Sequence, residues 1–374
     1  MGAKLLFLVT EDWYFCSHRL PPARAAKAAG YDVVVATRVN RHGALIEAEG
    51  FKLVPIALRR NSWNPLRELA AIINIIAIYR RERPHVVHQV AMKPALYGSI
   101  AARMTGVPVI VNALAGLGLV FSSPTRKARM LRALIVAAFR VVLNTRGAVL
   151  IVQNPDDANV VAGTMVAAKR VRLIRGSGVD VNHYSPAPEP TGTPIVMLAS
   201  RMLWNKGVGE FVASAALLRA RNVVARFVLV GQSDPENPAS ILDAQLQSWH
   251  DSGQVEWWGH CEDMRQAFAQ ASVVCLPSAY GEGVPKVLLE AAACARCIVA
   301  SDAPGCREIV QHGKTGVLVP LRDPRALASA IETLLAKPEL RAAMGKRARA
   351  LVEAEFSDAL VAEQTLAVYE ESST

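Results

Sequence analysis

Residues 271–290, ASVVCLPSAYGEGVPKVLLE, place an apolar run directly before a helix start. The run Ala271–Ser278 is typical of a buried strand, and Pro285 favours the first turn of a helix that we expect to continue from Lys286 to Ala295. A strand that leads into a helix is the repeating unit of an α/β fold. The free N–H groups of the first helical turn and the positive end of the helix dipole stabilise an anion such as phosphate.

Two carboxylates lie on either side of this helix start. Glu282 stands in the loop, and Glu290 follows eight residues later, about two turns along a helix that rises roughly 1.5 Å per residue. One carboxylate can accept hydrogen bonds from sugar hydroxyls while the other reaches a ribose, so the spacing suits a sugar nucleotide. The alternative interpretation is a solvated loop residue and a capped surface residue.

Two cations follow a second apolar strand, Ile195–Ala199. Arg201 and Lys206 stand five residues apart after it. Arginine pairs with an anion through two parallel hydrogen bonds and lysine acts as a point charge, so the two together suit a diphosphate. Ligands of open α/β sheets bind at the carboxyl ends of the strands. We therefore interpret these cations as functional, although either alone is compatible with an ordinary surface charge.

Taken in order, these residues resemble family 4 of the retaining glycosyltransferases, which have the two-domain GT-B fold. The marks of the family are Arg201 with Lys206, the pair Glu282 and Glu290, and the run Ile174–Asp180. The first half is similar to the bacterial subset that builds capsule, O-antigen or other lipid-linked surface glycans, through Lys93–Ala102 and Asn112–Gly118. The resemblance spans nearly the whole chain. It implies an α/β protein with two Rossmann-like domains whose parallel sheets face each other across a cleft.

Strand and helix patterns alternate through all 374 residues, which predicts parallel sheets in two domains. We expect an acceptor-binding domain over residues 1–178 and a domain that binds the nucleotide sugar over residues 179–355. Residues 356–374 are expected to form a helix that crosses back to the first domain, which the resemblance alone implies. Pro-rich His183–Pro194 is the linker candidate. The predicted strands are Lys4–Thr10, Tyr31–Thr37, His85–Gln89, Val107–Asn112, Val171–Ile174, Ile195–Ala199, Arg226–Gly231, Val255–Gly259, Val273–Pro277 and Cys297–Ser301.

The net charge of +10 is unevenly divided. Residues 1–178 hold 25 Lys and Arg against 9 Asp and Glu, a net of +16, and residues 179–374 hold 17 against 23, a net of −6. A basic first domain indicates an anionic partner, which is a nucleic acid, a membrane surface or a charged lipid acceptor. Zinc-finger spacing and aromatic-rich RNA motifs are missing from the sequence, so we expect no nucleic acid and favour the membrane.

Two predicted helices have basic edges. Leu66–Tyr79, followed by Arg80–Arg83, is too short to span a bilayer and is compatible with a core helix. Arg126–Arg146 suits either an interfacial helix, with its arginines on anionic lipid, or a helix packed on the sheet with a solvated basic face. The apolar run Leu5–Val9 is too short for a cleavable signal peptide. We expect a cytoplasmic protein, peripheral on the inner face of the plasma membrane.

The cysteines and acidic motifs predict neither a disulfide framework nor a metal. The six cysteines lack regular spacing, and Cys294 and Cys297 have no second pair, so we expect them to pack in the core. An Asp-x-Asp motif, which would indicate a metal-bound donor diphosphate, is missing from the sequence. We therefore expect no cofactor and a metal-independent reaction, in which the UDP-sugar is a substrate and Arg201 and Lys206 neutralise its diphosphate.

The resemblance also implies the roles of the donor site. The donor is UDP-linked, and Arg201 and Lys206 stabilise the charge on the leaving diphosphate while Glu282 orients the transferred sugar. Attack occurs on the face that the diphosphate leaves, so the anomeric configuration is retained without the nucleophile of two-carboxylate hydrolases. Glu290 holds the ribose hydroxyls, and the other donor-binding candidates are Gly283, Val284, Pro285 and Lys286 beside the phosphates and His260 and Cys261 near the uracil.

The acceptor side departs from the wider family, because Glu11–Arg19 replaces the usual Gly-Gly loop. We interpret His18 and Arg19 as contacts to an acceptor diphosphate, with the alternative that His18 caps a helix over Leu20–Ala29. His88, predicted to end a strand, and Lys93 are candidates either for acceptor contact or for structural roles. Gly116 and Gly118 lack the rest of a dinucleotide fingerprint and indicate a flexible loop.

Three hypotheses follow. The first is a retaining glycosyltransferase that moves a hexose or N-acetylhexosamine from a UDP-sugar to a polyprenyl-diphosphate-linked saccharide in bacterial surface polysaccharide synthesis. The second is another enzyme on the same fold, either a transferase with a soluble glucan acceptor or a sugar-nucleotide epimerase. The third is a non-catalytic protein that binds a glycan or a membrane surface, which the four residues Arg201, Lys206, Glu282 and Glu290 disfavour.

Overall fold

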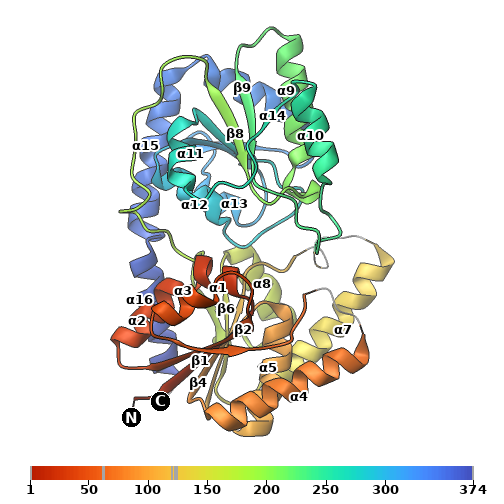
Figure 1. Ribbon diagram of the computed structural model, residues 1–374, viewed down its shortest axis with the longest axis vertical. Helices are drawn as coiled ribbons and strands as arrows, with labels where there is room; N and C mark the ends of the chain where they lie inside the picture. The colour runs from red at the N-terminus through yellow and green to blue at the C-terminus, as the bar shows by residue number, and fades with distance from the viewer. Residues whose placement is uncertain (1, 61–63, 119–120, 122–124, 373–374) are drawn as a thin grey trace. The chain divides into compact units, whose positions relative to one another are not determined.

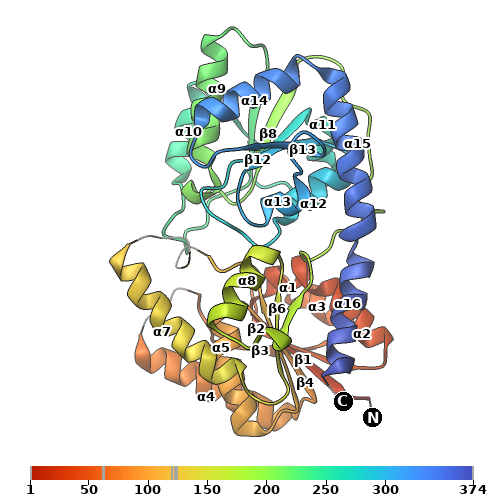
Figure 2. The same cartoon turned by 180° about the vertical axis from the view of Figure 1, so that it is seen from behind.

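The computed structural model covers the whole chain and describes residues 2–60, 64–118, 121 and 125–372. The chain folds into two compact units, one of Met1–Gly178 with Asp358–Thr374 and the other of Val179–Ser357 (Figures 1 and 2). Both units are α/β, and every strand pairing in their sheets is parallel. The predicted fold class, α/β with two parallel sheets, is confirmed.

The first unit has a seven-stranded sheet in the order β3-β2-β1-β4-β5-β6-β7. Its strands are β1 (Lys4–Glu11), β2 (Asp32–Arg38), β3 (Lys52–Pro55), β4 (Val86–Val90), β5 (Val109–Leu114), β6 (Ala148–Val152) and β7 (Val171–Leu173). The strand order changes direction between β1 and β4, which are neighbours in the sheet. Loops that follow these two strands therefore diverge, and such a switch point is where open α/β sheets bind ligands.

Helices cover both faces of this sheet (Figures 1 and 2). They are α1 (Asp12–His18), α2 (Leu20–Ala28), α3 (Gly43–Ala48), α4 (Pro65–Glu82), α5 (Met92–Thr105), α7 (Arg126–Leu143), α8 (Pro155–Thr164) and α16 (Asp358–Glu371). Leu5 and Phe7 of β1 pack with α2 and α16 on one face. Leu6 and Leu8 pack with α4 and α5 on the other. The strand β1 is apolar from Leu5 to Val9 because both of its faces are buried.

The second unit has a six-stranded sheet in the order β10-β9-β8-β11-β12-β13. Its strands are β8 (Ile195–Ala199), β9 (Arg226–Val230), β10 (Glu256–Trp257), β11 (Val273–Leu276), β12 (Cys297–Ser301) and β13 (Gly316–Val319). Its helices are α9 (Val208–Ala220), α10 (Asp243–Asp251), α11 (Met264–Gln270), α12 (Lys286–Ala293), α13 (Cys306–Ile309), α14 (Pro324–Leu335) and α15 (Pro338–Glu355). Helices α9 and α14 cover one face, and α11, α12 and α15 cover the other.

Strands β3, β6 and β13 lie outside the predicted set. The strand β6 is a continuous apolar run that follows a basic helix, and periodicity cannot separate such a run from a buried helical segment. The other two are four-residue strands at the edges of their sheets. The helix expected over Lys286–Ala295 ends at Ala293, because Ala295 adopts a left-handed conformation with φ of 54°.

The Pro-rich segment expected to be a linker is held against the second unit. The Arg349 guanidinium donates hydrogen bonds to the carbonyls of Val181 at 2.8 Å and Tyr184 at 2.5 Å. Arg341 forms an ion pair with Glu189 at 2.6 Å. These contacts involve α15, so the segment from Val179 onward folds as part of this unit.

The last helix, α16, completes the first unit. It packs on α2, and the Tyr369 hydroxyl lies 2.6 Å from Nδ1 of His88 in β4. Both side chains are buried, at 0% and 1% exposed. Burial, with a smaller contribution from Arg19, lowers the pKa of His88 well below its ordinary value, so the imidazole is neutral. The described atoms offer no hydrogen-bond partner to Nε2 of His88.

Tyr369 should therefore stabilise the first unit through its hydroxyl. We expect Tyr369→Phe to lower the free energy of unfolding by about 1–3 kcal/mol, because it leaves a buried ring nitrogen without its partner. Denaturant titration measures this change. Tyr31→Phe is the matched control, since Tyr31 contacts the Tyr369 ring but is partly exposed. Equal stability losses in the two variants would contradict a specific role for the His88 contact.

Candidate functional site

The carboxyl ends of the strands in the second unit carry the predicted donor residues. The loop after β9 meets the loop after β10, because the Gly231 N–H donates to the Gly259 carbonyl at 2.7 Å. The loop after β8 meets the loop after β11 through the Ala279 N–H, which donates to the Asn205 carbonyl at 3.0 Å. Parallel pairing puts all these loops at one edge of the sheet, so residues distant in sequence become neighbours.

Lys206 and Glu282 form the centre of this site. Lys206 belongs to a short 3-10 turn after β8, and Nζ of Lys206 contacts Oε2 of Glu282 in the loop before α12. The Ser278 hydroxyl, at the end of β11, donates to the other carboxylate oxygen, Oε1. Both oxygens of Glu282 therefore have a partner, and the carboxylate is fixed in orientation. Lys206 and Glu282 are 14% and 12% exposed, so solvent screens this pair only weakly.

Two glycines let the loops around this pair approach closely. Gly207 has φ of 78°, and a Cβ there would lie 2.0 Å from the Pro277 carbonyl oxygen. Gly305, after β12, has φ of 81°, and a Cβ there would lie 1.5 Å from the Gly283 carbonyl oxygen. Any side chain at either position would push the loops apart. The backbone at Gly283 and Val284, predicted to lie beside phosphates, is thus held in place by the loop after β12.

Arg201 lies beside the same cluster. Its guanidinium pairs with Asp234, in the loop after β9, at 2.6 Å. Burial raises the pKa of Tyr280, and the charges of Lys206, Glu282 and Arg201 act on the same hydroxyl. The charges of the three predicted catalytic residues therefore all act on one tyrosine. Asp234, Ser278 and Tyr280 were not predicted, although each follows a strand at its carboxyl end, which is the signal that could have found them.

The start of α12 carries the remaining predicted donor contacts. Pro285 is its N-cap residue, and Lys286 lies 3.9 Å from Glu290 one turn later. Burial raises the pKa of Glu290, whose side chain is 13% exposed, and the charge of Lys286 and the Tyr184 hydroxyl oppose the shift. Glu290 is thus a largely buried carboxylate at the ligand edge of the sheet.

His260 and Cys261 follow Gly259 at the same edge. His260 is exposed, and the Cys261 thiol lies 3.3 Å from the Asp263 carbonyl and packs against the core. The hydrogen bond between Gly231 and Gly259 joins their loop to the loop after β9, which carries Asp234.

The residues predicted to contact the acceptor lie in different elements of the first unit. His18 ends α1, where its ring stacks on Tyr14 at 4.1 Å, and α2 starts without a side-chain cap, so the helix-capping interpretation is wrong. His88 lies in the middle of β4 and is buried, so the prediction that it ends a strand is wrong and the structural role describes it. Arg19 is 5% exposed, and its Nε has no hydrogen-bond partner among the described atoms.

Lys93 and the glycine pair lie after β4 and β5. Lys93 contacts both carboxylate oxygens of Glu68 at 3.1 Å, and the Tyr97 hydroxyl donates to the same group at 2.6 Å. Gly116 and Gly118 have φ of 102° and 69°. The loop between them is anchored by Asp157 of α8, which accepts a hydrogen bond from the Leu117 backbone. Burial raises the pKa of Asp157 to about 6.

Chemically, the site of the second unit is a set of cations, each near a carboxylate. Arg201 is paired with Asp234, Lys206 with Glu282, and Lys286 lies near Glu290. Cations positioned in this way can bind a dianion by exchanging partners, and a carboxylate released by the exchange can accept hydrogen bonds from hydroxyl groups. This arrangement fits a phosphorylated sugar compound.

Comparison with known proteins matches both units to the same enzyme class. The family model for glycosyl transferases group 1 matches residues 193–337, and the model for glycosyl transferase 4-like domains matches residues 4–154. The chain is 26% identical over 365 residues, 94% of each chain, to N,N'-diacetylbacillosaminyl-diphospho-undecaprenol alpha-1,3-N-acetylgalactosaminyltransferase of Campylobacter jejuni. It is 27% identical to the putative glycosyltransferase EpsD of Bacillus subtilis, over 99% of this chain and 97% of the relative.

Solved structures share the fold of the whole chain. The HepE protein of Anabaena, in complex with UDP and glucose, superposes with a TM-score of 0.78 at 19% identity over 98% of both chains. Sucrose-phosphate synthase of Thermosynechococcus elongatus superposes with a TM-score of 0.81 at 21% identity over 99% of this chain and 98% of the other. Family models that match both units, with full-length relatives of the same class, place the chain in glycosyltransferase family 4: the protein is a group 1 glycosyltransferase with the GT-B fold.

Proposed function

We propose that this glycosyltransferase transfers a hexose or N-acetylhexosamine, with retention, from a UDP-sugar to a polyprenyl-diphosphate-linked saccharide in bacterial surface polysaccharide synthesis. The observation that carries the proposal is the cluster of Lys206, Glu282 and Ser278 beside Arg201. A diphosphate and a sugar are the two chemical groups that such a cluster suits, because it contains cations and an oriented carboxylate.

On donor binding, the diphosphate takes the place of the carboxylates as partner of Arg201 and Lys206. Each new charge-assisted hydrogen bond contributes about 1.5–3 kcal/mol. Glu282, still oriented by Ser278, then accepts hydrogen bonds from the sugar hydroxyls, and Glu290 accepts those of the ribose. Charge grows on the leaving diphosphate as the glycosidic bond breaks, and the fixed cations and the start of α12 stabilise it. The leaving phosphate takes the proton of the acceptor hydroxyl, which attacks from the same face.

For the acceptor, we propose the first unit and in particular Arg19. A buried guanidinium is costly unless an anion is near, and Nε of Arg19 has no hydrogen-bond partner among the described atoms. Arg19 lies between α1 and α2, the two helices that follow β1, and Lys93 lies in the first turn of α5, which follows β4. Strands β1 and β4 are neighbours at the switch point of the sheet. An acceptor diphosphate at this point is consistent with the Campylobacter relative, whose name gives a diphospho-undecaprenol acceptor.

A membrane-bound acceptor requires the protein to work at a membrane. Among the helices that the structure describes, none is long and apolar enough to span a bilayer. We propose peripheral attachment to the inner face of the plasma membrane through the basic first unit, whose residues 1–178 carry a net charge of +16.

A soluble acceptor is the second candidate. The chain is 29% identical over 329 residues to the alpha-maltose-1-phosphate synthase of Mycolicibacterium smegmatis, over 81% of this chain and 83% of the relative. We favour the lipid-linked acceptor, because the Campylobacter relative matches a larger share of the chain and the basic first unit suits an anionic lipid.

Donor class is tested by ligand-induced thermal stabilisation with UDP- and GDP-sugars. We expect only UDP compounds to raise the melting temperature of the wild type. Arg201→Ala should weaken UDP binding by roughly tenfold to hundredfold, the equivalent of one charge-assisted hydrogen bond. Arg221→Ala is the matched control, since Arg221 is also 39% exposed and pairs at 2.6 Å with an acidic residue away from the site. Equal losses in the two variants, or stabilisation by GDP compounds alone, would contradict the donor assignment.

The raised pKa of Glu290 predicts a pH dependence. An ionised carboxylate accepts ribose hydrogen bonds more strongly than a protonated one, so UDP affinity should fall as the pH is lowered. The loss should begin above the ordinary pKa of 4.5, because burial raises the pKa of Glu290. Calorimetric titration at several pH values measures this. Glu290→Gln lacks the titrating group, so its UDP affinity is measured at the same pH values as a control. The protonation of UDP itself affects both proteins equally. Identical pH profiles for the wild type and Glu290→Gln would contradict the proposed contact between Glu290 and the ribose.

Acceptor class is tested by turnover. With a UDP-hexose or UDP-N-acetylhexosamine, we expect glycosyl transfer to a polyprenyl-diphosphate-linked saccharide and none to a soluble glucan. Product analysis by mass spectrometry and by anomeric NMR checks both the acceptor and the retention of configuration. Transfer to glucan alone would favour the soluble-acceptor candidate, and an inverted product would contradict the proposed same-face attack.

A further inference from the structure

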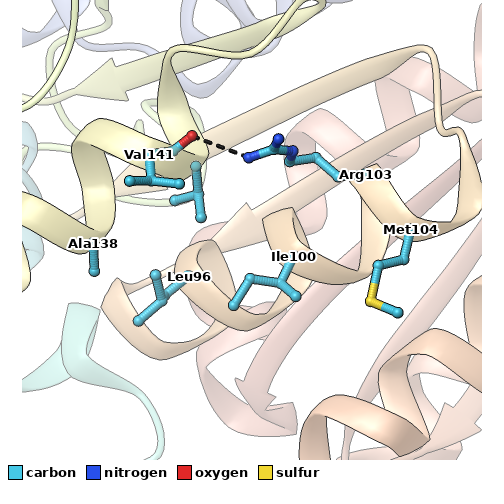
Figure 3. Close-up of a pocket in the computed structure, with 7 residues that line it drawn as sticks. Leu96, Ile100, Arg103, Met104, Ala138 and Val141 are labelled. Carbon is cyan, nitrogen blue, oxygen red and sulfur yellow. Dashed lines mark hydrogen bonds between the residues drawn. The ribbon is translucent and has the colours of Figure 1, made fainter.

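An apolar groove lies between α5 and α7 of the first unit. It encloses about 670 Å³ and is lined by Leu96, Ile100 and Met104 of α5 and by Ala138, Val141 and Val142 of α7. Figure 3 shows Leu96 and Ile100 on one helix facing Ala138 and Val141 on the other. The polar residue of the lining is Arg103, which reaches across and donates a hydrogen bond to the Val141 carbonyl at 3.2 Å. The lining is otherwise aliphatic.

Exposed apolar side chains continue the groove onto the surface of α7. Met130, Leu134 and Val141 are 68%, 63% and 65% exposed, and Met104 on α5 is 59% exposed. Spacings of three and four residues place side chains on one face of a helix, so Met130, Leu134, Ala138 and Val141 form a single stripe. Isolated exposed apolar residues are ordinary, but a stripe that borders an apolar groove marks an interaction surface.

The two helices that form the groove carry basic residues and no acidic residue. Between Glu82 and Asp156 the sequence contains no acidic residue, and both helices of the groove fall within that stretch. The same stretch contains the basic residues Arg83, Lys93, Arg103, Arg126, Lys127, Arg129, Arg132, Arg140 and Arg146. An apolar stripe with a basic border is complementary to the anionic headgroups and aliphatic chains of a membrane leaflet.

We propose that the α5–α7 groove binds one acyl chain of an anionic phospholipid while the arginines around it contact the surrounding headgroups. The inference rests on the proposed function in that a lipid-linked acceptor brings the protein to a membrane. Contact between two copies of the chain through this face is disfavoured, because a symmetric interface would bring the same basic residues of both copies together.

Vesicle flotation with the full chain tests the surface. We expect binding to phosphatidylcholine vesicles that contain about one third phosphatidylglycerol, little binding to pure phosphatidylcholine, and loss of binding as salt rises. Arg129→Gln and Arg132→Gln should each weaken binding by about fivefold. Equal binding to both vesicles, or to neither, would overturn the proposal. Binding that appears only when a polyprenyl phosphate is added would assign the groove to the acceptor instead.

The groove itself is tested by a pair of uncharged substitutions on α7. Ala138→Gln places an amide in the apolar lining and should weaken vesicle binding by about tenfold, because an acyl chain cannot pair with it. Ala133→Gln is the matched control, since Ala133 is exposed on the same helix and does not line the groove. Equal binding by the two variants would show that the groove holds no chain.

Self-association and donor binding are measured on the same variants. Light scattering reports the oligomeric state, and a dimer that Ala138→Gln disrupts would assign the groove to a second copy and overturn the proposal. Thermal stabilisation by UDP reports on the donor site, and its retention in every variant shows that the fold is intact. Failure of UDP to stabilise the wild type would contradict the proposed function. The comparison of vesicle binding by Ala138→Gln and Ala133→Gln would still show whether the groove binds an acyl chain.

Discussion

Parallel pairing of every strand is the constraint on which the site depends. In a parallel sheet each strand ends at the same edge, so the loops after β8, β9, β11 and β12 converge although long helices separate them in sequence. The edge is then closed by short contacts between loops. Gly207 against Pro277 and Gly305 against Gly283 bring backbones so near that only glycine fits. The cations and carboxylates of the donor site are positioned by that backbone.

The cations of this site are each paired with an acidic residue because the site is partly buried. Isolated charges at this edge would be costly, and the structure places Lys206 against Glu282 and Arg201 against Asp234. In the proposed donor complex, a diphosphate would replace one acidic partner with another, and the loops would not need to be rebuilt. Ser278 would keep Glu282 oriented during that exchange, since its hydroxyl contacts the carboxylate oxygen that Lys206 does not. The same balance explains why Lys286 lies next to the largely buried Glu290.

The two units differ in how their charged residues are balanced. Acidic residues balance the cations of the second unit, whereas the first unit has a long stretch without acid and a net positive charge. The helices α5 and α7, which form the apolar groove and stripe, lie within this stretch. Arg19, between α1 and α2, adds a buried positive charge whose electrostatic effect reaches His88 of β4. These features are the basis of our proposals that the first unit binds lipid and phosphate and that the second unit recognises the nucleotide.

The sequence by itself determined the α/β class, the two parallel sheets and which charged residues follow the strands of the second unit, because apolar runs, helix starts and charged residues after strands are local patterns. It did not reveal Asp234, Ser278 or Tyr280, and it placed His88 at a strand end, either as an acceptor contact or in a structural role. Only the tertiary structure decided these points. Lys206 and Glu282 are 76 residues apart, and His88 and Tyr369 are 281 apart. Their contacts depend on strand order, on loop backbone and on which side chains are buried together, and no local periodicity records that information.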